Sequence, residues 1–141
     1  MTNTTFKVLQ IDHIGVAVKQ FSPLANFFTL LGIESVGKEL VADQHVETEM
    51  FDVNAVHLEL LLPTDDQSTI MKFIEKRGEG FHHIALRVDN LENALAFLSE
   101  RGIQLIDSSP RRGAGGKRIA FLHPKSTGGI LVELSQVVTE F

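Results

Sequence analysis

The sequence predicts an α+β fold built from two copies of one module, each running strand, helix and then about three strands, related by a pseudo-twofold axis. The segments at 12–18 and 82–88 both carry His-Ile, a small residue, an aliphatic residue and a closing valine, and both alternate as strands do. A helical pattern follows each. Each half then ends on an aliphatic strand with one glutamate inside it, at 56–63 and 130–134. The repeat favours a single domain over residues 1–141, with module one at about 8–63, a linker helix at about 64–80 and module two at about 81–137.

Start and stop signals place the two module helices. The first helix is predicted to begin at Ser22 as its cap, with Pro23 in the first turn, and to end at Gly32. The second is predicted to begin at Asp89, because Glu92 three residues later completes a capping box. In both, apolar residues recur at helical spacing, so one face of each helix is expected to cover a sheet.

The remaining elements are shorter. Apolar spacing predicts a linker helix at about 69–76. Short strands are predicted at 36–41 and 47–53 in module one, and at 104–107 and 118–122 in module two.

Composition excludes several classes of protein. Among 141 residues there is no cysteine, which rules out disulfides, thiolate metal sites and a cysteine nucleophile. With 13 basic and 18 acidic residues, the net charge of −5 argues against nucleic-acid binding. No apolar run approaches the ~20 residues that span a membrane, and the polar first ten residues do not resemble a secretory signal. We therefore expect a cytoplasmic protein without nucleic-acid or membrane partners.

Four residues occupy matching positions of the repeat. His13 and His83 lie on the opening strands, and Glu59 and Glu133 lie on the closing strands. A pseudo-twofold axis would bring the two imidazoles and two carboxylates together, as a ligand set for one divalent transition metal. Taken singly, a strand histidine is more often structural and a strand glutamate more often solvated. The coincidence of all four at repeat positions favours the metal site.

The neighbours on the same strand faces support this choice. Gly15 shares the face of His13, and Ala85 shares the face of His83, so room is left for a ligand. His82 falls on the opposite, bulky face and is not chosen. The histidines without repeat partners are interpreted as surface or supporting groups, although His57 shares the face of Glu59; they are His45, His57 and His123.

Several longer stretches make the chain recognisable. They are residues 12–18, 59–63, 78–86 and the His-Pro-Lys-Ser stretch at 123–126 that leads to 129–134. On these stretches the chain resembles the methylmalonyl-CoA epimerases, a family of the vicinal oxygen chelate (glyoxalase/bleomycin resistance) superfamily. The resemblance implies βαβββ modules whose curved mixed sheet surrounds a metal cleft. It also implies that His13, His83 and Glu133 are metal ligands.

At two positions the match between this sequence and the family is less direct. The position of Glu59 is glutamine in some epimerases and glutamate in others. Some epimerases carry a proton-transferring glutamate at the position of Thr48, and here Glu47 and Glu49 flank it on the opposite face. We therefore expect Thr48 to contact substrate and Glu59 to replace the missing base.

The resemblance implies a metal-dependent epimerase that moves the α-proton of a methylmalonyl-CoA-like thioester through an enolate. Glu133 and Glu59 are the expected bases. The metal is expected to be divalent, with Co, Zn, Mn, Ni and Fe all compatible. A homodimer is also expected.

A glycine-rich basic segment at 110–118 is the candidate site for the phosphates of coenzyme A, with Arg112 and Lys117 as its binding residues. Lys125 is a weaker candidate. A solvated hairpin turn is an equally good interpretation of this segment.

Three other functions remain open. A glyoxalase I-type lactoylglutathione lyase would use the same four ligands. An iron-dependent ring-cleaving dioxygenase needs only two histidines and one glutamate. A non-catalytic small-molecule-binding protein of the same fold would not need the ligands, so their retention disfavours it.

Overall fold

The computed structural model describes residues 5–138, and the chain divides into two compact units. The N-terminal unit is His13–His82. The C-terminal unit combines the chain up to Asp12 with the chain from His83 onward. The first strand, β1 (Val8–Ala17), therefore contributes its first half to the C-terminal unit and its second half to the N-terminal unit.

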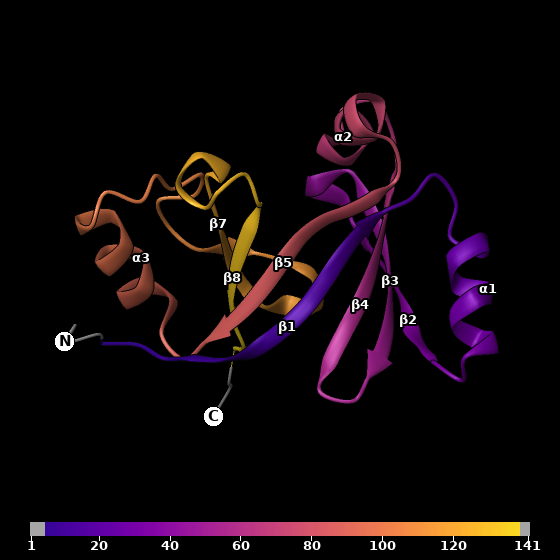
Figure 1. Cartoon of the computed structure of the whole chain (residues 1–141), viewed down its shortest axis with the longest axis horizontal. Coiled ribbons are helices and arrows are strands. Elements are labelled where there is room, and N and C mark those ends of the chain that lie inside the picture. Colours follow the sequence, from indigo (N-terminus) through magenta and orange to yellow (C-terminus); the bar gives the residue numbers. More distant parts are fainter. Residues whose placement is uncertain (1–4, 139–141) are drawn as a thin grey trace. The chain divides into compact units, whose positions relative to one another are not determined.

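The N-terminal unit follows β1 with a helix, three strands and the linker helix. These are α1 (Ser22–Leu30), β2 (Ser35–Val41), β3 (Val46–Val53), β4 (Val56–Pro63) and α2 (Thr69–Arg77). The strands lie in the order β2-β3-β4-β1, in which β4 and β1 are parallel and the other pairs antiparallel. Figure 1 shows α1 flanking this sheet.

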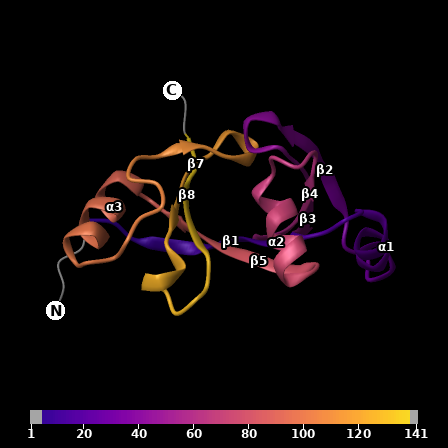
Figure 2. The ribbon, with the colours of Figure 1, turned by 90° about the horizontal axis from the view of Figure 1, so that it is seen from above.

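The C-terminal unit has the same plan. Its elements are β5 (Gly80–Val88), α3 (Leu91–Glu100), β6 (Arg111–Arg112), β7 (Arg118–Leu122) and β8 (Val132–Gln136). The strands lie in the order β5-β8-β7-β6, again with the opening and closing strands parallel and the others antiparallel. Figure 2 shows α3 alongside β7 and β8. The predicted repeat of strand, helix and three strands is confirmed.

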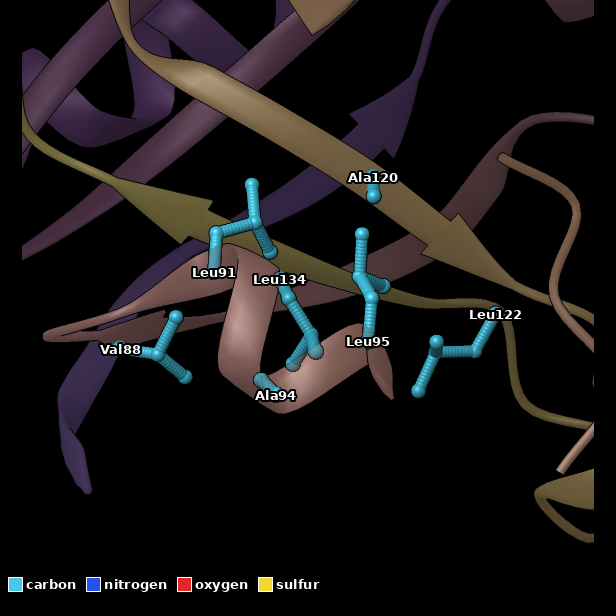
Figure 3. Close-up of a cluster of buried hydrophobic side chains, with 7 residues drawn as sticks. All are labelled: Val88, Leu91, Ala94, Leu95, Ala120, Leu122 and Leu134. Carbon is cyan, nitrogen blue, oxygen red and sulfur yellow. The ribbon is translucent and has the colours of Figure 1, made fainter. Parts of the chain in front are cut away.

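Each unit has its own apolar core. In the N-terminal unit, the ring of Phe28 from α1 packs edge-on against Phe51 of β3 with 5.1 Å between ring centroids. In the C-terminal unit, α3 places Leu91 and Leu95 against Leu134 of β8 (Figure 3). These cores hold the helices on one face of each sheet. The histidines and glutamates lie on the opposite face of each sheet.

The predicted helix caps were wrong in detail. Phe21 precedes α1 without a side-chain cap, and Ser22 is the first residue of the helix. Asn90 caps α3 by accepting the amide of Asn93 at 3.0 Å. Asp89 is not available for that role, because it accepts the amide of Lys7 at 2.7 Å.

The strand predicted at 104–107 was also wrong. Only Leu105 forms a single bridge, to Leu122. The carboxylate of Asp107 accepts the amide of Phe121 at 2.8 Å, so a side chain takes the place of a backbone acceptor. Pairing with β7 resumes at β6 instead.

Candidate metal centre

The N-terminal unit holds one histidine–glutamate pair on two parallel strands. The register of β1 and β4 pairs Gly15 with Glu59, and His13 lies two residues earlier on the same face. Its Nε2 is 3.6 Å from Oε1 of Glu59, and both residues are 4% exposed. Because Gly15 has no side chain, Glu59 has space to extend along this face toward His13.

The C-terminal unit repeats the arrangement. The register of β5 and β8 pairs Ala85 with Glu133, and His83 lies two residues before Ala85. Nε2 of His83 is 3.3 Å from Oε1 of Glu133, and both side chains are buried. The ring of Phe121, the cross-strand partner of Glu133, meets the ring of His83 edge-on at 5.6 Å.

These pairs fit a divalent cation. Ligand atoms bound to one first-row ion at about 2.1 Å lie about 3.0–3.5 Å apart around it. The nitrogen–oxygen separations of 3.3 and 3.6 Å are close to this spacing. Imidazole nitrogen and carboxylate oxygen are donors that Zn, Co, Mn, Ni and Fe accept. Each unit therefore offers one imidazole nitrogen and one carboxylate oxygen at a spacing that suits a cation.

Thr48 lies on the same face of the sheet as Glu59. In the antiparallel register Thr48 is opposite Leu61, and Met50 is opposite Glu59. Thr48 is buried, and its hydroxyl donates to the carbonyl of Glu39 at 3.4 Å. Glu49 is on the other face and accepts the hydroxyl of Ser35 at 2.8 Å, as strand alternation predicts.

The histidines without repeat partners contact nearby groups of their own unit. His45 contacts Asp65 at 2.9 Å, and His57 contacts Asp52 at 2.5 Å. His123 accepts the amide of Lys125 at 3.1 Å and so caps a short turn. His57 is in register with His13, on the face that carries Glu59.

The predicted phosphate-binding residues separate into two places. Arg112 and Lys117 line one pocket of about 590 Å³ on the C-terminal unit, together with Arg111, Arg118, Pro110, Gly115, Gly116 and Val138. Lys125 lies in the turn after His123, outside that pocket. The glycine-rich segment connects the antiparallel strands β6 and β7, and its cations line this pocket.

Sequence reasoning missed one buried group. Asp12 is fully buried, and its carboxylate contacts Arg87 and Lys117. Two signals were available: an aspartate just before His13 and an arginine inside the apolar pattern of β5.

Comparison with known proteins decides the family. The profile of the Glyoxalase/Bleomycin resistance protein/Dioxygenase superfamily matches residues 12–121. A bovine relative named "Methylmalonyl-CoA epimerase, mitochondrial" is 35% identical over 130 residues, which cover 90% of this chain and 74% of the relative. The chain belongs to this superfamily and, within it, to the methylmalonyl-CoA epimerase family.

Other similar proteins span nearly the whole chain. The "Uncharacterized protein YqjC" of Bacillus subtilis is 41% identical and covers 90% of this chain and 91% of its own. A Streptomyces coelicolor methylmalonyl-CoA epimerase variant, solved with 2-nitronate-propionyl-CoA, is 34% identical with a TM-score of 0.90. It covers 94% of this chain and 100% of its own. The vicinal oxygen chelate fold of this family is therefore confirmed.

Helices of the described part of the chain are all too short or too polar to cross a membrane. The cytoplasmic location stays a prediction.

Proposed function

We propose that this member of the epimerase family is a metal-dependent epimerase that moves the α-proton of methylmalonyl-CoA or a similar thioester. The observation that carries the proposal is the equivalence of the two buried pairs, His13–Glu59 and His83–Glu133. Each pair has the same spacing along parallel strands and the same donor atoms. The names of the relatives supply the substrate class.

These four side chains would hold one divalent cation. The repeat predicts that the two modules pack about a pseudo-twofold axis, which brings both pairs to one centre. A bound cation would stabilise the negative charge that develops on the thioester oxygen when the α-proton leaves. Co, Zn, Mn, Ni and Fe all suit these donors.

Two carboxylates would exchange the proton. Glu133 removes the α-proton, the C–H bond breaks, and its electron pair delocalises onto the thioester oxygen to give a planar enolate. Glu59, the repeat equivalent of Glu133, starts in its protonated form, donates that proton to the opposite face of the carbon and becomes a carboxylate. Proton exchange with water then returns both side chains to their starting states. A water molecule held at Thr48 is the alternative donor, because Thr48 lies on the same sheet face as Glu59.

The basic pocket would bind the phosphates of coenzyme A. Arg112 lies at its rim on β6, and backbone amides of the glycine-rich segment add further donors. A solvated loop is the competing interpretation. It predicts no change in KM when Arg112 is replaced.

Deuterium incorporation tests the reaction. Purified protein is mixed with methylmalonyl-CoA in deuterated water, and loss of the α-proton signal is followed by NMR. We expect exchange that chelator treatment abolishes and a divalent metal restores, with about one metal per chain by elemental analysis. No exchange by metal-loaded protein would overturn the proposal.

A glyoxalase I-type lyase is the second candidate, because it would use the same ligands. The hemithioacetal of methylglyoxal and glutathione, given to the same preparation, separates the two. Turnover of the hemithioacetal but not of methylmalonyl-CoA would assign the lyase. Metal-free protein that is inactive on both would assign a small-molecule-binding role.

The predicted homodimer is measured in the same preparation by light scattering. It carries no part of the mechanism above.

A further inference from the structure

Asp12 is a buried charge at a junction of three chain segments. Its side chain has no exposed surface, and it is the last residue of β1 within the C-terminal unit. Its cationic partners are 75 and 105 residues away, on β5 and at the end of the glycine-rich segment. A buried carboxylate is stable only when such partners compensate the loss of water.

Each oxygen of this carboxylate serves a different cation. Oδ2 accepts from Nε and Nη2 of Arg87 at 2.9 and 2.8 Å. Oδ1 accepts from Nζ of Lys117 at 2.6 Å. The Lys117 side chain is only 17% exposed, so its ammonium is turned inward to Asp12.

Lys117 stands at the end of a glycine-rich loop between β6 and β7. Gly115 and Gly116 both have a φ of +71°, a conformation that glycine adopts without strain. The amide of Gly113 donates to the carbonyl of Lys117 at 2.8 Å and forms the neck of the loop. A side chain at Gly113 would collide with Ile119, at 2.7 Å from its Cγ2. The loop therefore sits close on β7, and its end is fixed by the buried ion pair.

We propose that Asp12 is a positioning residue that fixes the glycine-rich loop through Lys117, and that Lys117 acts on substrate binding through this anchor. The loop lines the basic pocket. The conformation of the loop therefore sets the positions from which its backbone amides and Arg112 can bind an anionic ligand. The effect on substrate rests on the proposed epimerase function. The effect on the loop does not.

The competing role for Lys117 is direct contact with a phosphate. That role requires the ammonium to leave a fully buried carboxylate, so Asp12 would lose one of its two cationic partners described above. Breaking one arm of a buried ion pair is unfavourable because it leaves charge without compensation. The geometry thus favours the anchor.

Amide hydrogen exchange of the substrate-free protein tests the anchor. In Lys117→Met, Asp12 keeps Arg87, so the variant is expected to fold. We expect amides at 113–117 to exchange roughly tenfold to a hundredfold faster, as loss of one charge-assisted hydrogen bond implies. Asp12→Asn should give the same pattern. Arg118→Met is the matched control, because Arg118 lines the same pocket but pairs with the exposed Glu92. It should leave these amides unchanged.

Steady-state kinetics separate the anchor from direct contact. Asp12→Asn and Lys117→Met should each raise KM for the acyl-CoA by about tenfold, with kcat within about twofold. The double variant should be no worse than either single variant. If Lys117 touched phosphate directly, the two effects on KM would multiply.

Each result points one way. Unchanged exchange at 113–117 in Lys117→Met, or equal loosening in Arg118→Met, overturns the anchor. Multiplying effects on KM overturn its role in substrate binding. If the wild-type protein shows no epimerase activity but the loop loosens as expected, the proposed function fails and the anchor stands.

Discussion

The two histidine–glutamate pairs share one backbone frame but rest on different neighbours. Glu133 lies opposite Phe121, whose ring also meets His83. Glu59 lies opposite Met50, which is half-buried like Phe121. An aromatic ring is a rigid support, whereas methionine has three rotatable bonds. The repeat thus fixes the positions of the histidines and glutamates, while the neighbouring side chains decide how firmly each carboxylate is held.

Further contacts strengthen the support in the C-terminal unit. The guanidinium of Arg111 lies over the ring of Phe121, 5.5 Å from its centroid. The backbone amide of Phe121 is held by Asp107. The C-terminal pair therefore has the more rigid surroundings, which suits the role proposed above for Glu133.

Glu133→Gln tests the stiffer pair and has the largest expected effect. Removing this carboxylate takes away both a base and a charged ligand. We expect deuterium exchange to fall by about 10³-fold or more and metal affinity to fall as well. Deuterium exchange is measured by NMR, and metal affinity is measured by metal titration. Glu49→Gln is the matched control, a carboxylate of low exposure on the opposite face of β3, and it should keep both. Near-normal exchange in Glu133→Gln would show that Glu133 is not the base.

Glu59→Gln tests whether the second carboxylate is a base as well as a ligand. The amide oxygen of glutamine can still bind a metal but cannot take up a proton at neutral pH. We expect metal content near that of the wild-type protein and exchange lowered by about 10²-fold. Full activity with full metal content would end the two-glutamate mechanism and favour the water at Thr48.

Phe121→Leu and Met50→Leu compare the supports themselves. Phe121→Leu removes the ring contacts to His83 and Arg111, so its metal affinity should drop by about tenfold. The kcat of the fully metal-loaded variant should change little. Met50→Leu is nearly volume-conserving and should leave metal affinity within about twofold. Equal effects in both variants would show that the neighbours do not distinguish the two pairs.

Most of the strand arrangement around the two pairs was predictable, because the same sequence pattern occurs in both modules. The alternation around His13 and His83 predicted both the strands and the buried face. The small residues beside them, Gly15 and Ala85, predicted the space into which the glutamates extend. Pattern and structure agree at these repeated strands, whereas the strand predicted at 104–107 is a single bridge at Leu105.

Long-range pairing of charges could not be predicted in this way. Nothing local in the sequence says that Asp12 meets Lys117, because 105 residues separate them and only the folded strands bring them together. The same holds for Asp107, whose side chain displaces the strand expected around it. Side chains that replace backbone partners break the rule of alternation on which the predictions rest.

The loops at equivalent places of the two modules extend the comparison. Between β6 and β7 the loop is anchored by the buried Asp12–Lys117 pair. Between β2 and β3 it is held by His45, which contacts Asp65 on the surface, with side chains 40% and 49% exposed. Exposed pairs contribute little to stability, whereas a buried pair is costly to break. The N-terminal loop is thus expected to depend far less on its ion pair.

Asp65→Asn measures that dependence and has the smallest expected effect. The hydrogen bond from His45, and then the amide of Gln67, hold the pKa of the Asp65 carboxyl below its ordinary value of 3.8. A lowered folded-state pKa contributes stability that is present above the unfolded value and is lost as pH falls through the folded value. At about pH 5 the variant should melt no more than about 2 °C below the wild type, and well below pH 3.8 the two should converge. Asparagine keeps the acceptor for Gln67, so the difference reports the charge together with the contact of the second oxygen to His45. A difference that grew on acidification would mean that Asp65 is held in its protonated form, opposite to the contacts around it.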